Sequence, residues 1–123
     1  MPPARILVAD DDEAMRTTVA FTLLDDGYVV DEVESGNEVL RRVATSSEYD
    51  LVVMDIRMPG LSGLETARRL RAIRSAPRVI LMTAFPSPAV IDDARALHVP
   101  LLSKPFALGE LRRLAQDVMR SPL

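Results

Sequence analysis

The fold is decided by residues 49–60, YDLVVMDIRMPG. Within them, residues 51–54 form a short, unbroken apolar run, which is the pattern of a strand buried on both faces of a sheet. The run ends at Asp55, and the Pro59-Gly60 pair then stops any regular element. The stretch therefore predicts a covered strand that ends in a carboxylate. That carboxylate either marks where the chain reaches the surface or takes part in chemistry there.

Four further apolar runs share this pattern, and longer amphipathic segments separate them. The expected strands are Arg5–Ala9, Tyr28–Val33, Leu51–Met54, Arg78–Met82 and Leu101–Ser103. The expected helices are Glu13–Asp25, Gly36–Ala44, one that starts near Ser62, one that follows Ser87-Pro88, and Leu108–Met119. Because helices separate the strands, the strands are expected to pair in parallel through right-handed crossovers. The predicted fold class is α/β, a three-layer α/β/α sandwich built from five βα units around a doubly wound sheet.

Several helix ends carry recognisable signals. Gly27 is placed to terminate the first helix. Ser62 and Glu65, three residues apart, predict a capping box at the start of the third helix. Asp12 and Glu13, at the end of the acidic run that follows the first strand, are expected to cap the first helix.

The composition describes one globular domain. The chain has 123 residues, of which 48% are hydrophobic and 27% charged, so it can bury a core without disulfides. We expect residues 4–120 to form this single domain and residues 121–123 to be a tail or the start of a linker. No apolar run approaches the roughly 20 residues that span a bilayer, so no membrane segment is expected.

The charge and the missing cysteines exclude several classes of function. The formal net charge is -3, so the domain is not expected to bind nucleic acid or an anionic membrane directly. Without cysteine there is no disulfide framework and no thiolate metal site, which fits a cytoplasmic protein. The basic residues are fourteen arginines and a single lysine, Lys104, which makes this one ammonium a candidate functional group.

Chemically active side chains follow four of the five expected strands. Ligands bind at the carboxyl edge of a doubly wound sheet, so groups that follow the strands meet in one crevice. They are the acids Asp10 and Asp11 after the first strand and Asp55 after the third, the hydroxyl of Thr83 after the fourth, and the ammonium of Lys104 after the fifth; Ala84 and Pro105 come next after Thr83 and Lys104. Three carboxylates in one crevice repel one another, and a divalent cation removes that repulsion. Oxygen ligands without histidine or cysteine favour Mg²⁺, with Mn²⁺ as an alternative. Metal, ammonium and hydroxyl together suit phosphoryl transfer to a carboxylate.

Four motifs in the correct order resemble the receiver domains of bacterial two-component response regulators, which are CheY-like. They are ILVADDDE at 6–13, DLVVMDIRMPGLSG at 50–63, VILMTA at 79–84 and SKPF at 103–106. The resemblance implies a flavodoxin-like fold with strand order 2-1-3-4-5. It also implies a phosphorylation switch that receives its phosphoryl group from the phosphohistidine of a sensor histidine kinase.

The resemblance also implies roles for individual residues. Asp55 is the phosphoacceptor. Asp11 and Asp55 bind Mg²⁺ directly together with the backbone carbonyl of Arg57, while Asp10 reaches the ion through water. Thr83 and Lys104 contact the phosphoryl oxygens, and the Lys104–Pro105 peptide is expected to be cis.

The residues that would transmit the signal depart from the family pattern. Receivers often carry an aromatic residue at the position of Leu101, which moves inward as the threonine moves onto the phosphoryl group. With Thr83, Ala84, Leu101 and Pro105 as the switch residues, we expect a muted or altered response. Signalling is expected to use the face formed by the fourth helix, fifth strand and fifth helix, which is also a candidate homodimer surface.

Two further residues are candidates for controlling the lifetime of the phosphoryl group. Arg57 lies two residues beyond Asp55, and Phe85 lies two residues beyond Thr83. Both are expected to flank the acyl phosphate and gate the attacking water.

An enzymatic alternative is a phosphohydrolase of the haloacid dehalogenase type. Such enzymes need a second acid two residues after the nucleophile, and this chain has Arg57 at that position, which argues against the alternative. A third interpretation, a receiver-like scaffold without phosphorylation, is weakened because all the key positions are filled.

Overall fold

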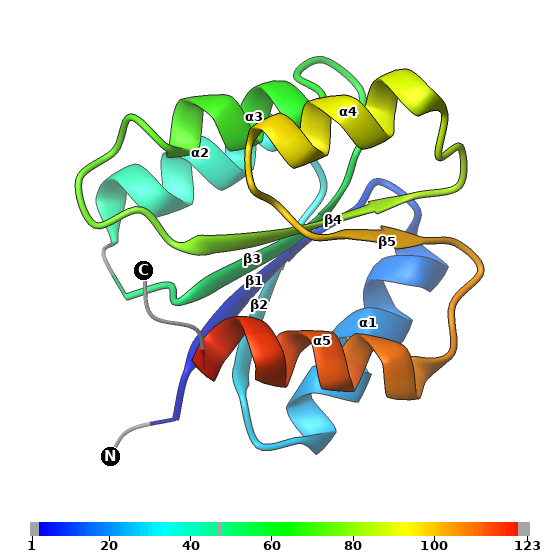
Figure 1. Ribbon diagram of the computed structural model, residues 1–123. Helices are drawn as coiled ribbons and strands as arrows, with labels where there is room; N and C mark the ends of the chain where they lie inside the picture. The colour runs from blue at the N-terminus through cyan, green and yellow to red at the C-terminus, as the bar shows by residue number, and fades with distance from the viewer. Residues whose placement is uncertain (1–2, 47, 121–123) are drawn as a thin grey trace.

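A computed structural model describes residues 3–46 and 48–120, in which strands and helices alternate along the chain (Figure 1). The strands are β1 (Arg5–Ala9), β2 (Val29–Val33), β3 (Leu51–Asp55), β4 (Arg78–Thr83) and β5 (Leu101–Ser103). The helices are α1 (Glu13–Asp25), α2 (Gly36–Thr45), α3 (Gly63–Leu70), α4 (Pro88–Ala96) and α5 (Leu108–Arg120). The expected order of elements is therefore confirmed. The predicted tail, residues 121–123, lies outside the described residues.

The strands form one parallel sheet in the order β2-β1-β3-β4-β5. Helices α1 and α5 cover one face of the sheet, and α2, α3 and α4 cover the other (Figure 1). This is the three-layer, doubly wound arrangement that the sequence predicts. The central strand β3 is buried at all five positions, as its unbroken apolar run indicates. No helix of the described residues is both long and apolar enough to cross a membrane.

Three strand boundaries differ by one residue from the sequence expectation. β3 and β4 each extend one residue further, because Asp55 pairs with Met82 and Thr83 pairs with Ser103 across the sheet. Asp55 and Thr83 are therefore held by the sheet itself. β2 begins one residue later than expected, because the backbone N–H of Tyr28 donates to Leu23 at the end of α1.

The helix-end signals are largely confirmed. Gly27 has φ +94° and its N–H donates to the Leu24 carbonyl, so it ends α1 in a conformation that glycine adopts readily. The hydroxyl of Ser62 accepts from the N–H of Glu65, as a capping serine does. The second half of the expected capping box is wrong: the Glu65 carboxylate instead accepts from two arginines one turn further along α3.

Candidate functional site

Three carboxylates meet at the carboxyl edge of the sheet. Asp10 follows β1, Asp11 comes next, and Asp55 ends β3, and one carboxylate oxygen from each lies within 4.8 Å of the others. Asp10 and Asp55 are only 1% and 8% exposed, whereas Asp11 is exposed to solvent. The central position of β1 and β3 in the sheet therefore places two buried acids and one accessible acid in a single cluster.

The single lysine of the chain bridges this cluster. Lys104 Nζ lies 3.0 Å from an oxygen of Asp10 and 3.0 Å from an oxygen of Asp55. Its backbone N–H donates to the Thr83 carbonyl at 2.7 Å, which fixes the lysine beside the end of β4. The Lys104–Pro105 peptide is cis, as the resemblance implies. The predicted acids and the predicted ammonium are thus in direct contact.

Burial dominates the electrostatics of Asp55 in this cluster. Burial raises the pKa of Asp55, and the charges of Asp10 and Asp11 raise it further, although Lys104 opposes them. Burial acts to lower the pKa of Lys104, but its hydrogen bonds to Asp55 and Asp10 outweigh burial and raise it. The Lys104 ammonium therefore does not fully offset the cost of burying an ionised Asp55.

The donor set fits a hard divalent cation. It consists of carboxylate oxygens without histidine or cysteine, and an exposed member, Asp11, leaves room for water ligands. Asp11 and Arg57 both line a hollow of about 430 Å³ beside the cluster. The residues that the sequence assigns to Mg²⁺ therefore lie together in the structure.

The hydroxyl predicted at the fourth strand end is buried at the same edge. Thr83 is 2% exposed, and its Oγ1 accepts a hydrogen bond of 3.0 Å from the N–H of Phe85. Because Oγ1 is the acceptor in that bond, the hydroxyl proton is available for another acceptor.

The two candidate gating residues contact each other. The guanidinium carbon of Arg57 lies 4.3 Å from the centre of the Phe85 ring, within cation–π range. Phe85 is 57% exposed, so the pair lies at the surface where the loops after β3 and β4 meet. The structure therefore brings together side chains that are 28 positions apart in the sequence.

The remaining switch residues occupy varied environments. Ala84 and Pro105 are exposed, next to Thr83 and Lys104 respectively. Leu101, the first residue of β5, is half-buried and packs against the core cluster on the α2–α4 side of the sheet. It is therefore anchored by apolar contacts rather than displayed in solvent.

Two residues at the site were not identified from the sequence. Gly63 begins α3, and a Cβ there would collide with the backbone carbonyl of Asp55 and lie 2.9 Å from the Cα of Ile56. Only glycine allows α3 to approach the end of β3 this closely. Arg16 donates to the Asp10 backbone carbonyl at 2.9 Å and also pairs with Glu32. Gly63 could have been noticed as a glycine at the first position of a helix. Nothing in the local sequence indicated the role of Arg16.

Comparison with known proteins agrees with this geometry. A family model described as the response regulator receiver domain matches residues 6–116. Response regulator MprA of Mycolicibacterium vanbaalenii is 38% identical over 122 residues, covering 96% of this chain and 51% of that protein. Transcriptional regulatory protein PdtaR of Mycobacterium tuberculosis is 34% identical over 111 residues, covering 89% of this chain and 53% of that protein. The chain spans about half the length of these curated relatives.

Solved structures show the same fold. The chemotaxis response regulator CheY4 of Vibrio cholerae superposes with a TM-score of 0.86 at 28% identity, covering 94% of this chain and 98% of that one. Response regulator TrrA of Thermotoga maritima, solved in complex with Mg²⁺-BeF, gives a TM-score of 0.83 at 34% identity with the same coverage. The chain therefore belongs to the receiver domains of two-component response regulators.

Proposed function

We propose that the domain, residues 4–120, accepts a phosphoryl group on Asp55 from the phosphohistidine of a sensor histidine kinase, with Mg²⁺ bound. The observation that carries the proposal is the contact of Lys104 with both Asp10 and Asp55 at the sheet edge where Asp11 is exposed. The Mg²⁺-BeF complex of the related Thermotoga protein supports a site for a cation beside an added group. The receiver would catalyse both the transfer and the later hydrolysis.

The reaction that we propose exchanges one bond to phosphorus for another. An Asp55 oxygen forms a P–O bond as the P–N bond of the phosphohistidine breaks, and the electron pair returns to the imidazole. Asp11, Asp55 and the Arg57 carbonyl, with Asp10 through water, would hold Mg²⁺, which would supply charge stabilisation. Lys104 neutralises charge that develops on one phosphoryl oxygen, and the Thr83 hydroxyl donates to another.

A labelling experiment tests the proposed phosphoacceptor. We expect the protein, incubated with Mg²⁺ and a small phosphodonor such as acetyl phosphate, to acquire an acid-stable, base-labile phosphoryl group detected by intact-protein mass spectrometry. Asp55→Ala should abolish the adduct because it removes the attacking carboxylate. Asp92→Asn, which removes an exposed carboxylate on α4, is the matched control and should label normally. An adduct that persists in Asp55→Ala contradicts the proposal.

We further propose that Arg57 and Phe85 limit the access of water to the acyl phosphate. Their cation–π contact holds the loops after β3 and β4 together and contributes about 0.5 to 1 kcal/mol at an exposed site. We expect Arg57→Ala and Phe85→Ala to change the half-life of the phosphoryl group by about two- to fivefold. Phosphorylation itself should remain.

The half-life is measured by following loss of the mass adduct after removal of the phosphodonor. Phe85→Tyr keeps an aromatic ring and should leave the half-life close to that of the wild type. Equal half-lives in the wild type and both alanine variants would refute the gating role.

The proposed switch uses Thr83, Ala84, Leu101 and Pro105 and acts on the face formed by α4, β5 and α5. Phosphorylation would shift an existing equilibrium towards a conformation that binds an output partner or a second copy of the chain. Since Leu101 already packs against the core, we expect a smaller rearrangement than an aromatic residue would make. Sedimentation velocity with and without phosphorylation measures dimer formation. Structures of the phosphorylated and unphosphorylated protein that show the same loop and the same Leu101 rotamer would exclude the switch.

A further inference from the structure

The outer edge of the sheet is only partly paired. β5 pairs with β4 from Leu81 to Thr83 only, so within the described residues 3–46 and 48–120 no strand lies beside the first half of β4 on that side (Figure 1). The Arg78 N–H donates towards β3, to Asp50, whereas the Leu81 N–H donates towards β5, to Pro100. This alternation directs the backbone N–H and C=O of Val79 outwards, to the side where β5 has not yet begun.

The described residues offer no partner for these two groups. Lys104 N–H donates to Thr83 O, so continuing the same ladder backwards sets the Val79 carbonyl opposite the nitrogen of Pro100, which has no hydrogen. His98 would offer the next acceptor along that ladder, but its φ of +55° departs from extended backbone, and no hydrogen bond joins its carbonyl to the Val79 N–H. Among the described residues, no backbone bond to the β5 side is made by Val79.

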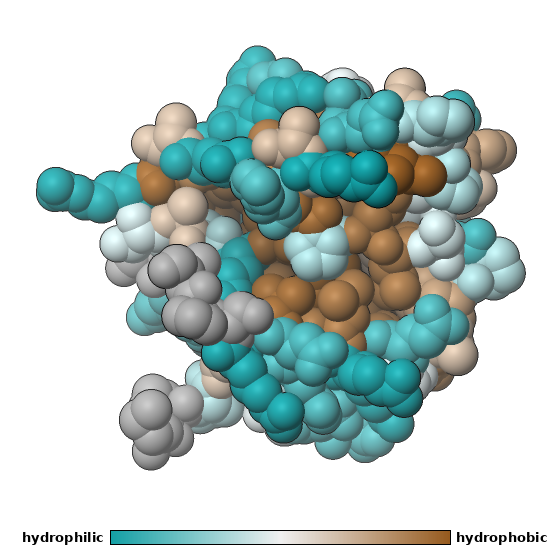
Figure 2. All heavy atoms as spheres, viewed as in Figure 1, coloured by the Kyte–Doolittle hydropathy of each residue, from teal (hydrophilic) through white to brown (hydrophobic). Residues whose placement is uncertain are grey.

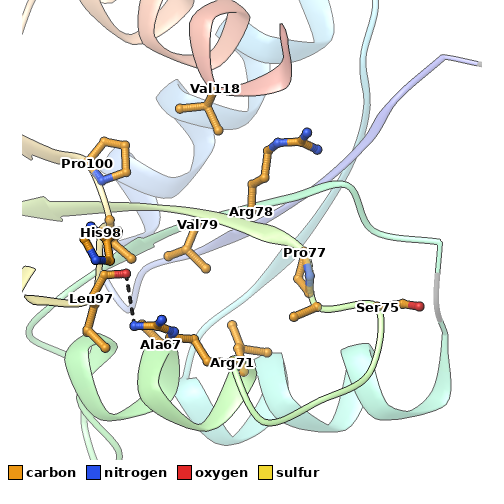
Figure 3. Close-up of a pocket in the computed structure, with 13 residues that line it drawn as sticks. Ala67, Arg71, Ser75, Pro77, Arg78, Val79, Leu97, His98, Pro100 and Val118 are labelled. Carbon is orange, nitrogen blue, oxygen red and sulfur yellow. Dashed lines mark hydrogen bonds between the residues drawn. The ribbon is translucent and has the colours of Figure 1, made fainter. Parts of the chain in front are cut away.

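This open edge lies in an apolar groove of about 600 Å³. Figure 2 shows a hollowed, brown surface on this side of the molecule, bordered by hydrophilic side chains. In Figure 3, Val79 lies in the middle of the groove, with Leu97 and Pro100 on one side, Pro77 on another and Val118 of α5 above. The groove therefore combines apolar walls with unpaired backbone groups, which together suit an extended peptide rather than a compact ligand.

The charge of the groove indicates the composition of that peptide. Its lining residues include basic side chains and no carboxylate. Arg71, exposed at the end of α3, donates only to the Leu97 carbonyl, at 3.3 Å (Figure 3), and has no acidic partner among the described residues. An acidic side chain on the incoming segment would supply the missing partner.

We propose that this groove binds an extended acidic and apolar segment of a partner protein, which adds a short strand to the open edge of β4. The segment exchanges hydrogen bonds with the N–H and C=O of Val79, buries alternate apolar side chains against the half-buried Leu97, Pro100 and Val118, and pairs a carboxylate with Arg71. This surface lies at the opposite end of β4 from Thr83 and is independent of the phosphoacceptor site.

Selection from a random octapeptide display library tests the proposal without a known partner. We expect enriched sequences to alternate apolar residues with at least one Asp or Glu. A selected peptide, made synthetically, should lose about tenfold in affinity for Arg71→Glu. Arg74→Glu, which makes the same charge change at an exposed position outside the groove, should bind the peptide about as well as the wild type.

Amide hydrogen exchange on the complex tests the mode of binding. The bound peptide should slow exchange of the Val79 N–H, and a peptide methylated on its pairing backbone nitrogen should bind more weakly. A library that yields no enriched sequence overturns the proposal. So do selected peptides that bind Arg71→Glu unchanged, or that leave exchange at Val79 unaffected.

Discussion

At the scale of single residues, the site depends on the burial of Asp55 beside other charged side chains. The carboxylate is buried, two further acids lie close by, and Lys104 is shared between Asp55 and Asp10. The pKa of Asp55 is consequently raised, mainly by burial. An ionised Asp55 therefore reduces the stability of the metal-free domain, and a cation bound beside it would offset this cost.

The substitution Asp55→Asn should therefore stabilise the metal-free protein at neutral pH. Because the folded pKa is raised above the unfolded one, the folded state takes up the proton first as the pH falls. As the pH falls from 7 towards about 4, the free energy of unfolding of the wild type should therefore approach that of Asp55→Asn. Urea unfolding in EDTA at several pH values measures the difference. A gap that is constant or widens on acidification would contradict the assignment.

At the scale of elements, the short strand β5 and the loop before it distinguish this receiver. The loop residue His98 directly follows the C-cap of α4 and adopts φ +55°, a conformation that favours glycine. The loop turns there and reaches Pro100, so β5 begins late and half of the β4 edge stays open.

Replacing His98 with glycine should relieve this backbone strain. We expect His98→Gly to stabilise the domain by about 0.5 to 1 kcal/mol, since the cost of the left-handed conformation exceeds the added entropy of an unfolded glycine. The midpoint of urea unfolding measures the gain. His98→Ala removes the imidazole but keeps the strain, so it should show no such gain. Equal stability of the two variants would show that the conformation is not strained.

At the scale of the whole molecule, the doubly wound sheet gathers groups that are far apart in the sequence. β1, β3, β4 and β5 all end at the same edge, so Asp10 and Lys104, 94 positions apart, are in contact. Binding of a cation at that edge acts on the folded state only, because the unfolded chain does not hold the three acids together.

Mg²⁺ should therefore stabilise the whole domain. We expect the free energy of unfolding to rise by about 2.7 kcal/mol when free Mg²⁺ is about 100 times its Kd, seen as a higher melting temperature. Asp11→Asn should remove most of this response. Asp12→Asn makes the same charge change but keeps a side chain that caps α1, so its response should persist. A response that survives Asp11→Asn would exclude the proposed ligand.

The sequence by itself determined the α/β class, the five βα units and the residues at the strand ends. Continuous apolar runs, capping residues and a carboxylate after a buried strand are local signals, and Asp55, Thr83 and Lys104 could be identified from them. Only the tertiary structure decided the bridging of two acids by Lys104, the support of Asp10 by Arg16, the contact of Arg57 with Phe85 and the open edge at Val79. These features depend on how strands pack and where β5 starts, because distances between elements are set by long-range pairing rather than by neighbouring residues.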